Sequence, residues 1–273
     1  MALGDVMVDV VSGELPAAGA RVHTDVVVRA GGSAVNAARC AVELGASATV
    51  VGRVGSDAAG ELVRRSLLDA GIEAQLASDE AVPTGIAVAL GSGDAAGIVA
   101  TRGANAGLAD ADVPDPLDGD ALLVSGFALF QEGSADAARA GLRRFRGEWT
   151  AVDLASPRLA ARADVAALAA EANVVFATAD EAKAVTGLEA DEAVRELAAQ
   201  FTVACVKLGA DGAFAAQGNK AERAAAAPVG GRSPLGAGDA FAAAFLVALG
   251  RSGSVMQALQ QACEAGARAA EGL

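Results

Sequence analysis

The 273-residue sequence is poor in the side chains on which many functional sites depend. Aromatic residues make up 3% of the chain, with one Trp and no Tyr, and His23 is the single histidine. A mechanism that needs a His–Asp dyad would have to use that one residue, which makes such mechanisms poor candidates. The three cysteines, Cys40, Cys205 and Cys263, lie far apart and form no CxxC pair. They argue against a disulfide scaffold and a zinc site, and they indicate buried thiols in a reducing cytoplasm.

Long apolar runs and positive charge are scarce as well. The longest apolar runs, 120–130 and 240–249, fall well short of the roughly 20 residues of a transmembrane helix. The N-terminus shows no basic region followed by an apolar stretch, so we expect no signal peptide and a cytoplasmic protein. A net charge of −13 argues against non-specific nucleic-acid binding. It leaves room for an anionic ligand, since helix N-termini and Mg²⁺ can supply local positive potential.

What the sequence does contain is an alternation of short β-branched runs with longer alanine-rich runs. The runs of the first kind predict core strands at 49–53, 121–124, 149–152, 173–176 and 202–208. The runs of the second kind predict helices at 33–44, 58–70, 134–145, 158–171, 180–186, 191–200, 236–249 and 254–271. Strands separated by such helices indicate a parallel sheet with helices on both faces. Further short strands at 26–29, 84–90 and 97–101, the last two flanking a turn at 91–94, predict a small separate sheet.

Three glycine- or carboxylate-marked segments are candidates for chemistry. Gly236-Ala237-Gly238-Asp239 opens a helix, where glycines let the backbone approach a ligand and free N–H groups form an anion hole. Asp239 could equally be a capping residue that complements the helix dipole. Gly31-Gly32-Ser33-Ala34-Val35-Asn36 opens a second helix, in which Asn36 is either a polar packing residue or a ligand-binding one. Gly4-Asp5-Val6-Met7-Val8-Asp9 is a predicted strand that ends on a carboxylate. No one of these segments decides a function.

Taken together and in order, these segments resemble the ribokinase-like, or PfkB, family of carbohydrate kinases over nearly the whole chain. The matching segments are Gly4…Asp9, Gly31-Gly32…Asn36, Leu44-Gly45, Gly52-Arg53-Val54-Gly55-Ser56-Asp57, Pro83-Thr84-Gly85, Gly103-Ala104-Asn105, Val206-Lys207-Leu208-Gly209-Ala210-Asp211-Gly212 and Gly236-Ala237-Gly238-Asp239. The resemblance implies a single ribokinase-like domain over 1–273. Its fold would be a three-layer α/β/α sandwich with a mostly parallel central sheet, and a β-sheet lid from about 10–30 and 83–103.

The resemblance also implies a reaction, transfer of the ATP γ-phosphoryl group to a hydroxyl of a sugar or a related small alcohol. Asp239 would be the general base, and Gly236, Ala237 and Gly238 would form the anion hole with it. The acceptor would be bound by Asp9, Gly32, Asn36, Arg102 and Asn105. The nucleotide would be bound along Lys207, Gly209 and Gly212, with Mg²⁺ held largely through water and Glu181. Lys207 could instead be an ordinary exposed lysine at the end of a strand. Arg102 could be a solvated arginine of the lid.

The sequence departs from the family pattern in four places. Ser233-Pro234-Leu235 stands where members usually have Asp-Thr-x, whose Asp often helps to ligate a monovalent cation, so dependence on such a cation is doubtful. Thr178 stands in place of the Asn of an Asn-x-x-Glu pattern that keeps Glu181. The ribokinase-type lysine after Gly-Gly is Ser33, which disfavours ribose. Gly4 comes almost at once, so we expect a first core strand that is very short or that lacks residues from its start.

Three functions remain open at this point. A sugar or sugar-acid kinase is favoured. In having a lid arginine, Arg102, the chain resembles the ketodeoxygluconate kinases, which bind a carboxylate. A nucleoside kinase of the same fold ranks lower, because such sites often stack a base on aromatic residues. A non-catalytic ligand-binding relative is the third, motivated by Ser233 and Thr178 and opposed by the intact Asp239. A homodimer through the lid is also expected, and the residues that could form its contact, or cover the inner side of the lid, are Val22, Val26, Val28, Ile86, Val88 and Ile98.

Overall fold

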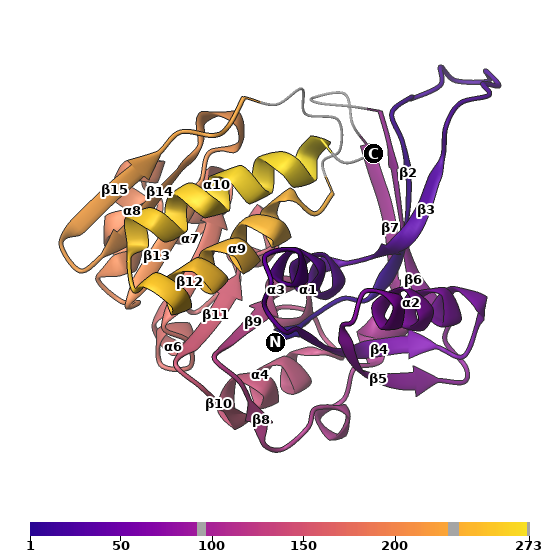
Figure 1. The fold of residues 1–273 in the computed structure, drawn as a ribbon, viewed down its shortest axis with the longest axis horizontal. Coiled ribbons are helices and arrows are strands. Elements are labelled where there is room, and N and C mark those ends of the chain that lie inside the picture. The colour runs from indigo at the N-terminus through magenta and orange to yellow at the C-terminus, as the bar shows by residue number, and fades with distance from the viewer. Residues whose placement is uncertain (92–96, 229–234, 272–273) are drawn as a thin grey trace.

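The centre of the molecule is a nine-stranded sheet in the order β15-β14-β13-β12-β11-β9-β1-β4-β5 (Figure 1). The computed structural model describes residues 1–91, 97–228 and 235–271. The strands from β13 to β5 pair in parallel, whereas β14 and β15 are antiparallel. Their bounds are β1 (Ala2–Leu3), β4 (Thr49–Gly55), β5 (Glu73–Asp79), β9 (Ala121–Ser125), β11 (Trp149–Asp153), β12 (Val174–Thr178), β13 (Val203–Lys207), β14 (Ala213–Gln217) and β15 (Lys220–Ala224). The predicted mostly parallel sheet is confirmed.

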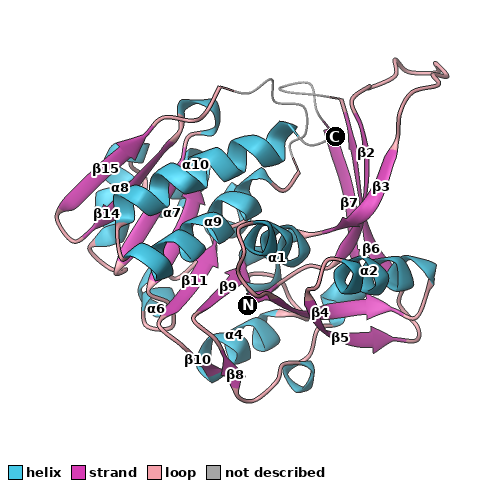
Figure 2. Ribbon diagram, viewed as in Figure 1, coloured by secondary structure: helices cyan, strands magenta, loops and turns pink. Residues whose placement is uncertain are grey.

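Helices cover both faces of this sheet, as predicted (Figure 2). One hydrophobic cluster joins the sheet to α1 (Ser33–Glu43), α2 (Ala58–Asp69), α9 (Ala237–Ser252) and α10 (Val255–Glu271). A second cluster joins it to α3 (Gly126–Leu129), α4 (Ala135–Arg144), α5 (Pro157–Ala160), α6 (Val165–Ala169), α7 (Ala179–Thr186) and α8 (Ala190–Ala198). Alanines dominate these faces, where small side chains let helix and sheet approach closely. Across the described residues, no helix combines the length and the apolar character needed to cross a bilayer.

Short elements complete the connections. Among the described residues, 3₁₀ helices lie at η2 (Ala104–Gly107), η3 (Asp110–Asp112) and η4 (Gly209–Asp211). Two short strands, β8 (Leu117–Asp118) and β10 (Phe145–Arg146), pair in parallel. In the core, Phe176 of β12 meets Phe245 of α9 edge-on, with ring centroids 5.5 Å apart. This contact fixes α9 against the middle of the sheet, and the first turn of α9 forms part of the site described below.

A separate four-stranded sheet, the lid, stands away from the main body at the right of Figure 1. Its order is β3-β2-β6-β7, with bounds β2 (Met7–Ser12), β3 (Val27–Gly31), β6 (Thr84–Leu90) and β7 (Gly97–Gly103). Strands β6 and β7 pair antiparallel, with Leu90 opposite Gly97. The hairpin is therefore confirmed, although most of its predicted turn at 91–94 lies outside the described residues. Parallel pairing of β2 with β6 joins the two halves of the lid.

The two faces of the lid differ. Residues opposite each other in the register share a face, so Val10, Val28, Val88 and Val99 form one row on the outer side. Val28 is 54% exposed and Val99 78%. Ile98 lies on the opposite, inner side, in register with Ala89. The apolar residues expected at a dimer contact thus divide between the two faces.

Several predicted elements need correction. Asp9 does not end a strand, because β2 continues to Ser12. The helix expected at 158–171 is two short helices, α5 and α6, since the Asp164 side chain accepts a hydrogen bond from Ala167 N and starts a new helix. Strands β5, β14 and β15 were not predicted at all. The first core strand is short, as expected, and β1 consists of Ala2 and Leu3.

Candidate active site

A cavity lies between the carboxyl ends of the central strands and the inner face of the lid. Its volume is about 560 Å³. Five neighbouring strands each place their last residue on its wall, and these residues are Leu3, Ser125, Asp153, Thr178 and Lys207. In parallel α/β sheets, ligands bind outside the carboxyl ends of the strands. The lid contributes Met7, Asp9, Ala87, Ile98, Ala100 and Arg102. This geometry identifies the cavity as the candidate active site.

The N-terminus of α9 opens onto this cavity. Gly236 precedes the first helical residue, Ala237, in the left-handed conformation with φ +87°. A Cβ there would approach the Asn36 side chain to 3.2 Å, so both the backbone angle and the space favour glycine. The first N–H groups of a helix have no intrahelical partner. The first turn of α9 therefore presents backbone donors, and the positive end of a 16-residue helix, to whatever occupies the cavity.

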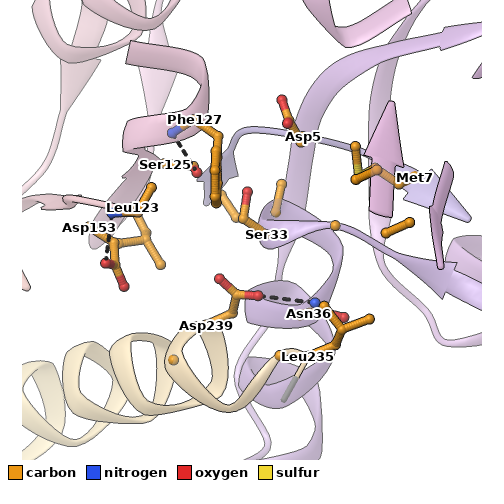
Figure 3. A pocket seen from close by; sticks show the side chains of 18 of the residues that line it. Asp5, Met7, Ser33, Asn36, Leu123, Ser125, Phe127, Asp153, Leu235 and Asp239 are labelled. Atoms are coloured by element: carbon orange, nitrogen blue, oxygen red, sulfur yellow. Dashed lines mark hydrogen bonds between the residues drawn. The ribbon is translucent and has the colours of Figure 1, made fainter. Parts of the chain in front are cut away.

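Asp239 lies in this first turn, and its side chain points towards Asn36 of α1 (Figure 3). Its Oδ2 accepts a hydrogen bond of 3.0 Å from Asn36 Nδ2. Burial raises the pKa of Asp239 to about 7, helped by Asp153 and Asp9 and opposed by Asn36 and Lys207. The carboxyl group can therefore gain or lose a proton near neutral pH.

A second group of charges lies at the ends of β11 and β13. Lys207 Nζ is 2.6 Å from Asp153 Oδ2, and both side chains are largely buried. Burial by itself would lower the pKa of Lys207, but Asp153, Glu181 and Asp239 together raise it. The lysine therefore stays charged among three carboxyl groups. It is a buried ion-pair partner, not an ordinary solvated strand-end lysine.

Glu181 and Thr178 form a reciprocal capping box at the start of α7. Thr178 Oγ1 accepts a hydrogen bond from Glu181 N, and Thr178 N donates to Glu181 Oε2 at 2.8 Å. Burial, and then the charge of Asp153, raise the pKa of the Glu181 carboxyl, while Lys207 and Thr178 act in the other direction. Thr178 therefore has a structural role of its own. One Glu181 oxygen is held by the helix, and the side chain still lines the cavity.

The opposite wall is built by the start of α1 and by β2. Gly32 precedes α1 with φ +86°, and a Cβ there would lie 2.4 Å from the carbonyl oxygen of Asp5, so the tight approach of these segments requires glycine. Asp9 is 2% exposed. Burial raises its pKa, opposed by Arg29, Arg39 and the backbone N–H of Gly32. In the described part of the chain, Asp9 Oδ2 and Ser33 Oγ are buried without a hydrogen-bond partner.

Arg102 lines the cavity but is committed to a carboxylate of the protein. Its Nη2 lies 2.7 Å from Asp5 Oδ1, its Nε also donates to Asp5, and Ser134 Oγ accepts a further bond. The Asp5 side chain is 7% exposed and that of Arg102 16%. The charge of Arg102 is thus neutralised within the protein. It is neither the solvated lid arginine that the sequence left open nor an unpaired cation facing the cavity.

Asn105 is a structural brace and does not line the cavity. Its Oδ1 accepts from Val6 N, and its Nδ2 donates to the carbonyls of Val6 and Arg102, each at 2.8 Å. It ties the segment between β1 and β2 to the end of β7. Gly209 and Gly212 flank η4 in the turn after β13 and also lie outside the cavity wall.

Most of the predicted site residues are brought together. The predicted site residues that line the cavity are Asp9, Gly32, Asn36, Arg102, Glu181, Lys207, Gly236, Gly238 and Asp239. Ala237 lies between Gly236 and Gly238, in the first turn of α9. Asp153 was missed. A buried strand that ends on a carboxylate would have indicated it, but the strand was predicted to stop at Val152. Ser233 and Pro234, the basis of the cation prediction, lie outside the described residues.

Comparisons with known proteins agree with this geometry. The model of the "pfkB family carbohydrate kinase" matches residues 1–272. No curated protein sequence matches the chain significantly. Among solved structures, adenosine kinase from Sinorhizobium meliloti is 23% identical with a TM-score of 0.84, and the match covers 97% of this chain and 91% of that one. Fructokinase from Vibrio cholerae O395, in a form with fructose, ADP and calcium bound, is 24% identical with a TM-score of 0.82, covering 99% and 92%.

A third similar structure is a putative ribokinase II from E. coli in complex with ATP and Mg²⁺. It is 18% identical with a TM-score of 0.83, and the match covers all of this chain and 92% of that one. At these identities the likeness establishes the fold, and the family follows from the match over the whole chain. On that evidence the protein belongs to the pfkB family of carbohydrate kinases.

Proposed function

We propose that this protein is an ATP-dependent kinase that transfers the γ-phosphoryl group to a hydroxyl of a sugar or sugar acid. The observation that carries the proposal is Asp239, a carboxyl with a pKa of about 7 in the first turn of α9. Phosphoryl transfer to a hydroxyl needs a base for the hydroxyl proton and preorganised donors for the phosphoryl oxygens. The first turn of α9 offers both within one helical turn. Structures solved with fructose and ADP, or with ATP and Mg²⁺, share this fold.

In the proposed mechanism, the ionised Asp239 accepts the proton of the acceptor hydroxyl. The hydroxyl oxygen forms a bond to the γ-phosphorus, the bond from that phosphorus to the β–γ bridging oxygen breaks, and ADP leaves. The backbone N–H groups of Ala237, Gly238 and Asp239 stabilise the negative charge on the transferring group, and Gly236 shapes this anion hole. The hydrogen bond from Asn36 keeps the carboxylate oriented.

The acceptor is proposed to lie against Asp9, Gly32 and Asn36. The buried Asp9 Oδ2 and Ser33 Oγ support this placement, because buried polar atoms normally have hydrogen-bond partners and a polyhydroxy acceptor would supply them. Arg102 and Asn105 would act indirectly, by holding Asp5 and Val6 and so the wall on which Asp9 lies.

The nucleotide is proposed to extend from Asp239 past Lys207 towards the turn with Gly209 and Gly212. Within the described residues, no cluster of three or more Asp, Glu, His or Cys side chains forms a metal site. Mg²⁺ would therefore be held mainly by phosphate oxygens and water, with Glu181 as the protein carboxylate, a donor set that suits a hard cation. When bound, the ion would neutralise charge on the phosphates. The sequence Ser233-Pro234-Leu235 disfavours a requirement for a monovalent cation.

A nucleoside acceptor is the second candidate, supported by one observation. Phe127 lines the cavity and is 37% exposed, so its ring could stack on a base. It is the one aromatic residue among the residues that form the cavity wall in the described chain. A sugar or sugar acid remains the better candidate, because the unpartnered polar atoms of the cavity lie at Asp9 and Ser33, on the lid side.

The proposal extends to assembly and location. The apolar outer row of the lid, from Val28 to Val99, would pair with the same row of a second copy in a homodimer. Replacing Val99 by Lys should then give a monomer in light scattering. The protein would work in the cytoplasm, where ATP is available and the buried free thiols of Cys40, Cys205 and Cys263 stay reduced.

A coupled assay for ADP formation tests the main proposal. The purified chain is supplied with ATP, Mg²⁺ and single members of a panel of sugars, sugar acids and nucleosides. We expect acceptor-dependent ADP formation with at least one sugar or sugar acid. Turnover restricted to nucleosides would favour the second candidate. Measurable acceptor binding by calorimetry without ADP formation from any member would identify a non-catalytic relative and overturn the proposal.

A further inference from the structure

A second cavity of about 360 Å³ adjoins the candidate active site. Asn36, Leu235 and Gly236 line both cavities and form the boundary between them. The side chains at this boundary are the small amide of Asn36 and the larger Leu235, and Gly236 adds none. A molecule whose reacting hydroxyl lies near Asp239 could place a more distant group in the second cavity.

Three guanidinium groups from three elements surround this second cavity, which we call the arginine pocket. They belong to Arg29 of β3, Arg39 of α1 and Arg268 in the last turn of α10. The carboxylate on its wall is Glu43 of α1. Asp9, opposite Arg29 in the lid register, faces the same group from the active-site side. Positive charge therefore predominates in one cavity of a chain with a net charge of −13.

Arg102, which lines the candidate active site, is an example of an arginine with a structural role in this protein. Its guanidinium is saturated by Asp5. By contrast, Arg39 donates to the carbonyl oxygen of Ala30 at 3.1 Å, and neither Arg39 nor Arg268 forms an ion pair within the described ranges. Burial and then the neighbouring charge of Arg29 lower the pKa of Arg39. Glu43 and Asp9 act in the opposite direction, but the net result is a lowered pKa, so a further anion would favour the charged form of Arg39.

Arg29 also connects the pocket to the acceptor side of the active site. It lies directly across from Asp9 on the inner face of β3 and β2. Arg29 and Arg39 both act on the Asp9 carboxyl electrostatically. An acceptor bound at Asp9 and Asn36 therefore lies beside these two guanidinium groups. Arginine is well suited to carboxylate and phosphate, which its planar fork binds through two parallel hydrogen bonds.

We propose that the arginine pocket binds an anionic group carried by the phosphoryl acceptor. The preferred acceptor is then a phosphorylated sugar or a sugar acid, in which a hydroxyl reaches Asp239 and the carboxylate or phosphate reaches Arg29, Arg39 and Arg268. This inference rests on the proposed kinase function and narrows its substrate class. The sequence favoured Arg102 as the residue that binds the anionic group of the acceptor. The proposal assigns this role to Arg29, Arg39 and Arg268 instead.

Matched acceptor pairs test the inference in the coupled assay: fructose against fructose 6-phosphate, ribose against ribose 5-phosphate, and glucose against gluconate. We expect kcat/KM at least about ten-fold higher for the anionic member of one or more pairs, the usual effect of a charge-assisted hydrogen bond. In the variants Arg29→Gln, Arg39→Gln and Arg268→Gln, the KM for that acceptor should rise about ten-fold or more with kcat nearly unchanged. In Arg268→Gln, turnover of neutral acceptors should stay as in the wild type.

Arg65→Gln is the matched control, since Arg65 is an exposed arginine on α2 that pairs with Asp69. It should leave every kinetic constant unchanged. Arg268→Gln removes an exposed side chain at a helix end and is the variant that folding should tolerate best. Thermal melts of all four variants separate loss of fold from loss of anion binding.

The possible failures are distinguishable. Equal kcat/KM for both members of every pair, unaffected by the arginine variants, would overturn the inference and leave the kinase proposal standing. Stimulation of neutral-acceptor turnover by inorganic phosphate, lost in Arg268→Gln, would also overturn it, because the pocket would then take a free anion. If no acceptor is turned over, the kinase proposal fails, and calorimetry decides about the pocket. Binding of the sugar phosphates to the wild type but not to Arg268→Gln supports it, and equal binding refutes it.

Discussion

Replacing Asp239 by Asn should strongly reduce turnover and at the same time stabilise the fold. Burial is the main cause that raises the pKa of the Asp239 carboxyl group from the ordinary value of 3.8 to about 7. A group whose pKa is higher in the folded than in the unfolded protein stabilises the fold only while it is protonated. That contribution is complete below about pH 4 and is lost as the pH rises towards and through 7. The substitution removes the cost of the buried charge and keeps an oxygen for Asn36 to donate to.

The size of the effect follows from the shift. The change from 3.8 to about 7 corresponds to roughly 4 kcal/mol at about 1.4 kcal/mol per pKa unit, once the carboxyl is fully ionised. The side chain is partly exposed, so solvent screening reduces this figure. We expect Asp239→Asn to raise the free energy of unfolding by about 1–3 kcal/mol at pH 8.5 and by almost nothing at pH 4. Loss of a general base should lower kcat by about a hundred- to ten-thousand-fold.

Urea unfolding at pH 4, 7 and 8.5, combined with the ADP assay, measures both effects. For the wild type, kcat/KM should rise with pH around a midpoint near 7, as Asp239 loses its proton. Asp136→Asn is the control, because Asp136 is an exposed aspartate in the first turn of α4. It should cost about 0.3–1 kcal/mol, as expected for a carboxylate at a helix N-terminus, and leave kcat unchanged. If Asp239→Asn destabilises the protein in the same way, or keeps wild-type kcat, Asp239 is a dipole-complementing residue and the mechanism is wrong.

Three further substitutions follow from the cavity wall. Lys207→Met should lower the free energy of unfolding by about 3–5 kcal/mol because it leaves Asp153 buried and unpaired, and urea titration should show recovery when Asp153→Asn is added. Ala155→Gly should raise the urea midpoint, by about 0.5–1 kcal/mol in stability, because Ala155 holds a φ of +71°; an unchanged or lower midpoint would contradict this. Arg102→Met should cost several kcal/mol by leaving Asp5 unpaired, without changing the ratio of anionic to neutral acceptor kcat/KM; a change in that ratio would return the anion-reading role to Arg102.

Much of the fold could be predicted because local sequence patterns mark most of its strands and helices. The helix expected at 33–44 is observed at Ser33–Glu43, since a glycine turn opens it and Gly45 follows it. The edge strand β5 was missed because its sequence, Glu73–Asp79, mixes polar and small residues and is buried on neither face. Its strand state comes from pairing with β4, a tertiary contact that local periodicity does not show. Strand β14 was missed for a similar reason, since three of its five residues are alanine.

The site could be predicted where it depends on backbone-shaping residues and not where it depends on distant partners. Gly236 and Asp239 were found because glycines and a carboxylate at a helix start form a short local pattern that indicates an anion-binding turn. The roles of Arg102 and Asn105 were not, because their partners lie 97 and 99 positions away, at Asp5 and Val6. A single sequence says that an arginine is present in the lid. It does not say that an aspartate already neutralises its charge.

The charge balance of the cavity explains why the start of α9 matters so much. Among the described residues, five carboxyl groups line the cavity, and the cationic side chains Arg102 and Lys207 are paired with two of them, Asp5 and Asp153. The remaining carboxyls, Asp9, Glu181 and Asp239, all have a raised pKa. In the proposed mechanism, the described side chains therefore contribute little attraction for a polyphosphate, which would come instead from the backbone N–H groups of α9 and from a cation bound with the nucleotide. Burial is the main cause of the raised pKa of Asp239, and the neighbouring carboxyls Asp153 and Asp9 add to it. Under the proposed mechanism, the acidic wall thus helps to maintain the base.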